Sequence, residues 1–354
     1  MKPATPFIDA MRVLAVPHEQ AANILKRLST QGLVDPSLRI AKRGHEVLIP
    51  VLREPSFSMT DFAARWETEA RLAPRAPRRD PRRTLHERLQ SSGIPADLAP
   101  RRWKRIGDVV VLRLRPAAQE YAKEIGRIYG SVLGARTVLE DRSGIHGPLR
   151  TPDVRVLWGD GTKTVHVEAG VRYALDVAQV MFSAGNIEER AAIARRIRPG
   201  AVVADLFAGI GYFTLPIAAR GRAERIYACE LNPTSYAYLV RNLRLNRVTN
   251  VVPLQGDCRQ VMPRGVADWV ILGHFDAREY LDVAFRALRG RGTIVYHELG
   301  PKEQFPDAMT RRLAAAARAH WMQVASIRTR IVKSYAPGIV HAAADVEVRP
   351  QARP

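Results

Sequence analysis

The chain has 354 residues, in which 55 lysines and arginines against 35 aspartates and glutamates give a formal charge of +20 at neutral pH. Hydrophobic residues make up 46% of the sequence, which excludes a disordered chain and is enough for the cores of about two or three domains. The sequence contains no run of about 20 apolar residues and no signal-peptide pattern, so we expect a cytoplasmic protein without a membrane partner.

The cysteines and the charge bear on function. Cys229 and Cys258 are far apart, and neither has a companion Cys or His at the spacing of metal ligands, so no disulfide scaffold and no metal site is predicted. The excess of positive charge points to an anionic partner, with nucleic acid ahead of a membrane surface. The alternative is an arginine-rich composition without a specific partner.

The N-terminal part of the chain has two regions of different pattern. Residues 1–53 are predicted to form a small α/β domain, with a helix from Pro17 to Gln31 and a strand around Ile49. Residues 54–105 are predicted to be a basic linker region, because prolines interrupt the arginine-rich stretch from Arg71 to Arg88 and break both helix and strand periodicity. This linker is either a solvated connector or an arm that contacts RNA.

The remaining chain predicts two more domains. Residues 106–180 read as a middle α/β domain, with a strand at 107–112, a helix at 116–130, and strands at 154–158 and 164–173 paired around Gly159-Asp160-Gly161. From residue 181 to 354 strands and helices alternate, which predicts a doubly wound parallel sheet. Its expected strands are 201–206, 226–229, 251–254, 269–272 and 293–297, followed by an antiparallel pair at 321–332 and 339–348.

The strongest motif is Asp205-Leu206-Phe207-Ala208-Gly209-Ile210-Gly211-Tyr212-Phe213, at the end of an apolar strand. Ligands of open α/β sheets bind at the carboxyl ends of strands, and Gly209 and Gly211 let the backbone approach a small molecule closely. No Gly-Lys-Ser/Thr follows, and the glycine spacing does not fit the dinucleotide fingerprint. We expect Asp205 to support the loop by accepting hydrogen bonds from backbone N–H groups.

Two acidic residues follow the next two strands. Glu230 ends the second strand, where a carboxylate can accept hydrogen bonds from both hydroxyls of a ribose. Asp257, followed by Cys258, comes after the third strand, where an acid typically receives the exocyclic amine of an adenine. Taken alone, an acid at either position is as often a cap or turn residue as a ligand-binding residue. Together with the glycine loop they resemble the S-adenosylmethionine (AdoMet) sites of class I methyltransferase-like, Rossmann-type folds.

Longer segments carry a resemblance to one family. The sequence resembles the guanosine-37 tRNA methyltransferase and wybutosine-synthesis superfamily over most of its length. Its N-terminal module, its strand at 106–110 and its residues 332–338 resemble the archaeal members in particular. The segments are Met181-Phe182-Ser183-Ala184-Gly185-Asn186 with Glu188-Glu189-Arg190, the glycine loop, Cys229-Glu230-Leu231-Asn232-Pro233, and Asn242-Leu243-Arg244-Leu245-Asn246. The resemblance implies an AdoMet-dependent enzyme that needs no metal.

The superfamily has two branches with different chemistry. Gly185-Asn186, Leu272-Gly273-His274 and Tyr296-His297-Glu298 fall with the branch that transfers the 3-amino-3-carboxypropyl group, and the chain lacks the Asn-Leu/Pro-Pro sequence of the N1-methylating branch. This implies transfer of that group from AdoMet to the imidazole-ring carbon of 4-demethylwyosine at position 37 of tRNA(Phe), with release of 5′-methylthioadenosine. The partner would be the anticodon stem-loop. The alternatives are a tRNA guanosine-37 N1-methyltransferase and a non-catalytic tRNA-binding protein.

The remaining site residues surround the expected cofactor. Ser183 and Arg190 are placed to hold the AdoMet carboxylate, with Asn186 and Glu189 capping the helix between them. His274 and His297 follow the fourth and fifth strands and are the candidate catalytic residues, because a histidine can take up a proton near neutral pH. The competing interpretations are that Ser183 and Asn186 only cap the helix and that Arg190 is solvated. His274 and His297 would then have only a structural role.

Overall fold

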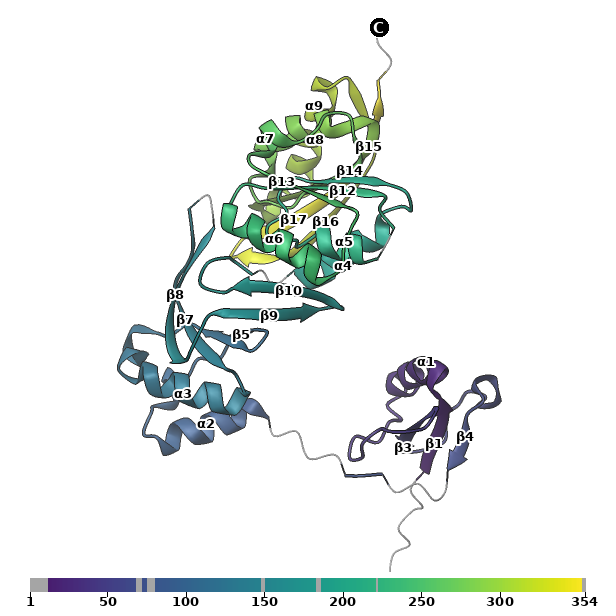
Figure 1. The fold of residues 1–354 in the computed structure, drawn as a ribbon, viewed down its shortest axis with the longest axis vertical. Helices are drawn as coiled ribbons and strands as arrows, with labels where there is room; N and C mark the ends of the chain where they lie inside the picture. Colours follow the sequence, from purple (N-terminus) through teal and green to yellow (C-terminus); the bar gives the residue numbers. More distant parts are fainter. Residues whose placement is uncertain are drawn as a thin grey trace, which may run out of the picture. The chain divides into compact units, whose positions relative to one another are not determined.

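The computed structural model describes residues 12–67, 72–74, 80–147, 150–182, 186–220 and 222–351. The chain divides into two compact units, Met1–Asp80 and Pro81–Pro354 (Figure 1). Among the helices that these described residues form, none is long and apolar enough to cross a membrane.

The first unit is a small antiparallel sheet covered by one helix. Strands β1 (Arg12–Pro17), β2 (Ala41–Arg43), β3 (Glu46–Val51) and β4 (Arg65–Glu67) lie in the order β2-β3-β1-β4. Helix α1 (His18–Thr30) packs Ile24 and Leu28 against Leu14 and Ile49 of the sheet. The predicted helix and strand are therefore confirmed.

The predicted linker contains a helix, so the expectation that prolines prevent regular structure up to Arg88 is wrong. Helix α2 (Pro81–Ser91) begins at a proline, which is tolerated in the first turn because its missing N–H has no partner there in any helix. Leu85 and Leu89 stand one turn apart and are buried in a core shared with Ile125 of α3 (Ala122–Leu133). A 3-10 turn (Ala96–Leu98) and strand β5 (Trp103–Ile106) follow, and residues 75–79 lie outside the described part.

The second unit begins with a four-stranded sheet of order β5-β6-β7-β8. Its other strands are β6 (Val109–Leu112), β7 (Thr137–His146) and β8 (Thr151–Gly159). A 3-10 turn (Pro116–Tyr121) and α3 connect β6 to β7. The predicted pairing around Gly159-Asp160-Gly161 is wrong, because β8 pairs with β7. Strands β9 (Lys163–Glu168) and β10 (Val171–Asp176) instead pair with each other through Ala169 and Gly170, both with positive φ (48° and 83°).

The large sheet has seven strands in the order β13-β12-β11-β14-β15-β17-β16. The first five are parallel and the last two antiparallel, which confirms the predicted doubly wound sheet with its C-terminal pair. The strands are β11 (Val202–Asp205), β12 (Arg225–Glu230), β13 (Val251–Gln255), β14 (Ala267–Leu272), β15 (Leu288–Pro301), β16 (Met322–Ala336) and β17 (Ile339–Pro350).

Helices cover both faces of this sheet, with α4, α5 and α6 on one face and α7, α8 and α9 on the other (Figure 1). Each face has its own apolar core, with Ile193 and Ile217 on the first side and Phe285 and Leu313 on the second. The helices are α4 (Ile187–Arg196), α5 (Thr214–Ala219), α6 (Pro233–Leu245), α7 (Cys258–Val261), α8 (Leu281–Ala287) and α9 (Asp307–Ala319), with 3-10 turns Ala277–Tyr280 and Lys302–Gln304.

Asn242 of α6 and Asn246, the residue that follows this helix, fasten the β9–β10 hairpin to the large sheet. The buried carboxamide of Asn242 accepts a hydrogen bond from the Ala174 N–H (2.7 Å) and donates to the carbonyls of Ala174 and Ile210 (both 3.1 Å). Asn246, one turn later, makes the same two-way contact with the backbone of Arg172. Because Ile210 belongs to the glycine loop, Asn242 connects the hairpin directly to the candidate ligand site.

Candidate active site

A cavity of about 600 Å³ lies at the carboxyl ends of the parallel strands. Its walls include Phe207 after β11, Glu230 of β12, Asp257 after β13 and His274 after β14. Strand β11 lies between β12 and β14, so the cavity is at the point where the strand order reverses. This is the expected ligand position in an open α/β sheet.

Asp205 stabilises the glycine loop through hydrogen bonds. This carboxylate is fully buried, and it accepts hydrogen bonds from the Phe207 N–H (3.3 Å) and the Thr214 hydroxyl (2.7 Å). Burial raises the pKa of Asp205 to about 6. Asp205 is not among the residues that line the cavity, which fits the supporting position expected for it.

The two glycines of the loop have different surroundings. Gly209 lines the cavity with φ of 57°, and an added Cβ would lie 2.4 Å from the Tyr212 ring. Gly211 does not line the cavity. An added Cβ there would lie 2.7 Å from Leu215 and 3.3 Å from Leu239, so this glycine permits close packing of the loop against α5 and α6.

Glu230 is the carboxylate closest to the loop. Its Oε2 accepts a hydrogen bond from the Gly209 N–H and its Oε1 from the Asn232 N–H, both at 2.7 Å. Burial raises the pKa of this carboxyl group. Each carboxylate oxygen can accept a second hydrogen bond, so Glu230 can receive two hydroxyl groups from the cavity.

Asp257 and Cys258 form the wall after β13. Asp257 accepts a hydrogen bond from the Arg259 N–H (2.9 Å) as the cap of α7, and its pKa is lowered because the Arg259 side chain binds both carboxylate oxygens. The Arg259 side chain is more than half exposed, so this pair can open at little cost. Cys258 is buried against the cavity, and burial raises the pKa of its thiol to about 12.

Arg190 is a buried residue rather than a solvated one. It is 2% exposed, and its Nε and Nη2 donate to Oε1 (3.0 Å) and Oε2 (2.7 Å) of Glu168 on β9. The rings of Phe182 and Tyr212 each lie 5.7 Å from its guanidinium carbon. Arg190 still lines the cavity, so it presents a positive charge whose counter-ion comes from the hairpin.

The predicted capping of α4 is wrong. Asn186 stands at the N-cap position, but its φ and ψ of −121° and 23° lie outside the extended range of a cap, and its side chain makes no capping bond. Glu189 binds Arg330 of β16 in place of the helix end. The buried Oδ1 of Asn186 has no hydrogen-bond partner among the described residues, and Asn186 lines the cavity. Ser183 lies outside the described residues.

His274 lines the cavity at the end of β14 and stacks on Phe207, with ring centroids 5.0 Å apart. Its Nδ1 accepts a hydrogen bond from the Asp276 N–H (3.2 Å), so the neutral ring carries its proton on Nε2. Burial, and then the charge of Arg150, lower its pKa. In this tautomer His274 offers a hydrogen-bond donor through Nε2.

His297 does not line the cavity. It is 2% exposed, and its Nδ1 lies 3.0 Å from Nε2 of His341, a fully buried residue of β17 that does line the cavity. His341 was missed at the sequence level because it lies 44 residues beyond His297, and only the pairing of β15 with β17 brings the two together.

Arg150 and Lys333 add positive charge to the cavity wall and were also not predicted. Burial, followed by the charges of Lys104 and Arg190, lowers the pKa of Lys333. The acidic groups Glu230 and Asp257 follow parallel strands, whereas the basic groups come from other elements. The cavity thus combines an acidic side suited to hydroxyl and amine groups with a basic side suited to carboxylate or phosphate.

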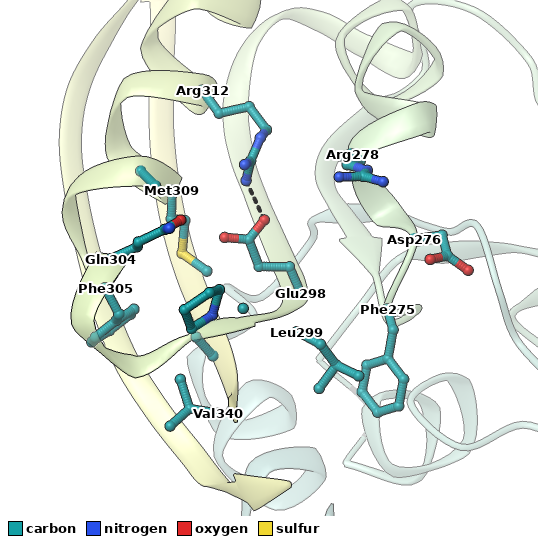
Figure 2. Close-up of a pocket in the computed structure, with 14 residues that line it drawn as sticks. Phe275, Asp276, Arg278, Glu298, Leu299, Gln304, Phe305, Met309, Arg312 and Val340 are labelled. Atoms are coloured by element: carbon teal, nitrogen blue, oxygen red, sulfur yellow. Dashed lines mark hydrogen bonds and ion pairs between the residues drawn. The ribbon is translucent and has the colours of Figure 1, made fainter. Parts of the chain in front are cut away.

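A second, smaller cavity of about 270 Å³ shares Phe275 and Asp276 with the first. Figure 2 shows the ion pair of Glu298 and Arg312 among the side chains that line it. The Tyr296 hydroxyl also donates to Glu298 (2.9 Å). The backbones of Asp276 and Glu298 form an isolated antiparallel bridge, which fixes this shared wall.

The residues of the large cavity fit AdoMet. Glu230 lines the cavity with a carboxylate that can accept further hydrogen bonds, as ribose hydroxyls would donate, and a side chain at Gly209 beside it would clash with Tyr212. The orphaned Oδ1 of Asn186 and the charge of Arg190 suit the ammonium and carboxylate of the amino-acid arm.

Comparisons with known proteins agree with this fit. The model of the TRM5/TYW2 methyltransferase domain matches residues 164–325, and models of a TYW2 N-terminal domain and a tRNA methyltransferase 5 N-terminal domain match residues 85–162 and 14–58. The tRNA(Phe) (4-demethylwyosine(37)-C(7)) aminocarboxypropyltransferase of Pyrococcus horikoshii is 37% identical over 73% of this chain and 95% of that protein. The tRNA (guanine(37)-N(1))-methyltransferase Trm5b of Pyrococcus abyssi is 31% identical over 94% of this chain and 98% of that protein.

Solved structures give the same result. The structure of P. horikoshii TYW2 in complex with MeSAdo superposes with a TM-score of 0.68 at 34% identity, over 76% of this chain and 99% of that one. The structure of M. jannaschii TYW2 in complex with AdoMet has a TM-score of 0.59 at 34% identity, over 70% of this chain and all of that one. From its strand order, its ligand cavity and these likenesses, the chain belongs to the TRM5/TYW2 family.

Proposed function

We propose that this protein transfers the 3-amino-3-carboxypropyl group of AdoMet to the imidazole-ring carbon of 4-demethylwyosine at position 37 of tRNA(Phe). The observation that carries the proposal is the 37% identity to an aminocarboxypropyltransferase over 95% of that protein's length. Leu272-Gly273-His274 at the end of β14 supports it, since N1-methylating members of the superfamily carry an Asn-Leu/Pro-Pro type sequence there.

The chain's own residues would act mainly by orientation. AdoMet supplies an electrophilic carbon next to a positively charged sulfur, which is a good leaving group. Glu230 would hold the ribose, and Asp257 with the backbone of Cys258 would hold the adenine. Asn186 and Arg190 would hold the amino-acid arm so that its γ-carbon, in place of the methyl group, faces the tRNA base. Alignment of this kind supplies much of the acceleration in such displacements.

Doubly labelled AdoMet distinguishes this reaction from methylation. The full chain is incubated with tRNA(Phe) carrying 4-demethylwyosine and, separately, tRNA carrying unmodified guanosine 37, using AdoMet labelled in the methyl or the carboxyl position. We expect carboxyl label in the first tRNA and 5′-methylthioadenosine as by-product. Methyl label in the second tRNA, with S-adenosylhomocysteine, overturns the proposal in favour of the N1-methyltransferase that the likeness to Trm5b supports.

We propose that the anticodon stem-loop is the part of the tRNA that this protein grips, with α2 among the phosphate contacts. Arg82, Arg83 and Arg88 are exposed on this helix, whereas Leu85 and Leu89 are buried. Arg83 forms an exposed ion pair with Glu87, and Arg82 lies over the Trp103 ring. Phosphate contacts make the association constant fall as the salt concentration rises. Each contact adds about 0.7 to 0.9 to the negative slope of log association constant against log salt concentration.

Replacing the three arginines of α2 by alanine tests this proposal. The dissociation constant for an isolated anticodon stem-loop is measured between low and moderate salt for the wild type and the triple variant. We expect a weaker salt dependence in the variant. An unchanged slope means that α2 does not contact the RNA. If the wild type does not bind the isolated stem-loop, the anticodon arm is not sufficient for tRNA binding.

A further inference from the structure

Two buried histidines and a carboxylate lie in a row that ends at the large cavity. His297 on β15 pairs in register with Ala343 of β17, two residues from His341, so the two rings are diagonal neighbours on one face of the sheet. Helix α4 covers this face and brings Oε1 of Glu189 to 4.0 Å from Nε2 of His297. The order is therefore Glu189, His297, His341 and then the cavity.

The hydrogen bond between the rings can run in either direction. In one arrangement His297 Nδ1–H donates, His341 carries its remaining proton on Nδ1, and His297 Nε2 turns a lone pair toward the Glu189 carboxylate. In the other, His341 Nε2–H donates, and His297 carries its proton on Nε2, facing that carboxylate. The second arrangement is favoured because the Glu189 carboxylate, which Arg330 binds through both oxygens and Arg196 approaches to 3.8 Å, attracts an N–H and repels a lone pair. It leaves an unprotonated Nδ1 on His341.

The surroundings keep both rings neutral in the absence of substrate. Burial and then the charge of Lys333 lower the pKa of His341 to about 4, against the opposite effect of Glu189. Burial also lowers the pKa of His297, together with His341, Arg330 and Arg196. Neither His341 Nδ1 nor His297 Nε2 has a hydrogen-bond partner among the described residues. His341 lines the cavity, and its buried Nδ1 has a lone pair that no described residue binds.

We propose that His341 accepts the proton that the tRNA base loses on alkylation, and that His297 and Glu189 are positioning residues that hold it in the accepting tautomer. The proposal rests on the proposed function. The ring carbon of the base forms a bond to the γ-carbon of AdoMet, and the S–Cγ bond breaks with its electron pair going to sulfur. The alkylated carbon then holds both a hydrogen and the new substituent, and loss of that hydrogen as a proton restores the aromatic ring.

His341 suits this step better than His274, the other histidine of the cavity. Nδ1 of His274 already accepts a backbone hydrogen bond, so its other ring nitrogen, Nε2, carries a proton. The proton passes to Nδ1 of His341, directly or through one water molecule. As it arrives, Nε2–H of His341 can move to His297, whose positive charge then faces Glu189. A weak base is sufficient, because the alkylated ring is a far stronger acid than the starting base.

The variant His341→Gln removes the acceptor while placing an amide near the position of Nε2, where it can still bond to His297. Single-turnover rates are measured with tRNA that carries hydrogen or deuterium on the ring carbon to be alkylated. We expect the rate to fall by about 100-fold, and deuterium to slow the variant but not the wild type, because proton loss becomes rate-limiting. AdoMet binding by calorimetry stays unchanged. The matched control is His320→Asn, since His320 lies on Phe285 and lines neither cavity.

Two further measurements keep the proposal testable if His341→Gln fails to fold. In His297→Asn an amide oxygen can accept the hydrogen bond from His341 but cannot take up a proton. We therefore expect a smaller loss of rate than in His341→Gln, and again a deuterium isotope effect that the wild type lacks. Nitrogen-15 NMR of the histidine rings, without cofactor or tRNA, should show His341 protonated on Nε2 alone. Protonation of His341 on Nδ1, or an unchanged rate in a folded His341→Gln, overturns the proposal. Failure of the proposed function appears separately, as absent carboxyl-label transfer by the wild type.

Discussion

Arg190 and Glu168 form a two-point ion pair in the interior, with N···O distances of 3.0 and 2.7 Å. The two side chains are 2% and 6% exposed, so neither charge is solvated. Arg190 belongs to α4 and Glu168 to the hairpin, and the pair therefore joins the hairpin to the cavity wall.

Replacing Glu168 by glutamine should destabilise the protein strongly. The shape of the side chain is kept, but Arg190 becomes a buried charge without a counter-ion, at a cost of about 3–5 kcal/mol in the free energy of unfolding. Urea denaturation measures this change. The matched control is Glu124→Gln, whose ion pair with Arg127 is exposed and should leave stability unchanged. Equal effects of the two substitutions contradict the prediction.

Replacing Glu230 by glutamine should weaken AdoMet binding. The amide can still accept one hydrogen bond, but the charge that strengthens the bonds to two ribose hydroxyls is lost. We expect the dissociation constant from calorimetry to rise by roughly 10- to 100-fold, which is about 1.4–2.7 kcal/mol. Glu224→Gln, at an exposed position before β12, serves as the control. Unchanged affinity in Glu230→Gln means that the ribose binds elsewhere.

The two buried histidines should make stability fall in acid. The pKa of His341 is about 4 in the folded protein and near 6.5 in the unfolded chain, so between these values the unfolded chain binds more protons. The stabilising effect is complete above pH 6.5 and is lost as the pH falls toward 4. Asp205, with a folded pKa of about 6, acts in the opposite direction because its folded form binds more protons over much of this range.

Denaturation at several pH values tests this balance. In His341→Gln the slope of unfolding free energy against pH should decrease by up to about 1.4 kcal/mol per pH unit between pH 4 and 6.5. In Asp205→Asn the slope should become steeper over the same interval. A slope that is unchanged in His341→Gln contradicts the assignment of His341 as neutral in the folded protein.

Asn242→Ala should loosen the hairpin more than Asn246→Ala. Asn242 is fully buried and its removal leaves backbone groups of Ala174 and Ile210 without partners, at about 1–3 kcal/mol each. The contacts of Asn246 with Arg172 are exposed, so water can replace them. Hydrogen exchange of the β10 amides, with Asn246→Ala as control, measures the difference. Exchange in Asn242→Ala that is as slow as in the wild type means that Asn242 does not fasten the hairpin.

The large sheet was predictable, whereas much of the site was not. The motif around Gly209, Glu230 and Asp257 is local, since each residue lies at or within a few residues of the end of its own strand, and the strand order then brings the three together. His341 and Lys333 come from the C-terminal pair, and only the register of β16 and β17 with β15 places them at the cavity. No local pattern carries that information.

Local sequence propensity also gave two wrong predictions, the linker and the cap of α4. Prolines predicted a linker, but Pro81 stands where a helix accepts one, and the leucine spacing that follows was the stronger signal. Asn186 and Glu189 have the spacing of a capping pair, yet Arg330 from a distant strand binds Glu189 instead. Tertiary electrostatics decided that contact.

The wall shared by the two cavities has a thermodynamic consequence. Phe275 and Asp276 face both spaces, and the bridge from Asp276 to Glu298 leaves this segment little freedom to yield to one side alone. A molecule that shifts this wall on filling one cavity would also change the shape of the other. By reciprocity, each occupant changes the affinity of its neighbour by the same factor, so that the smaller cavity takes part in the binding equilibrium of the larger one.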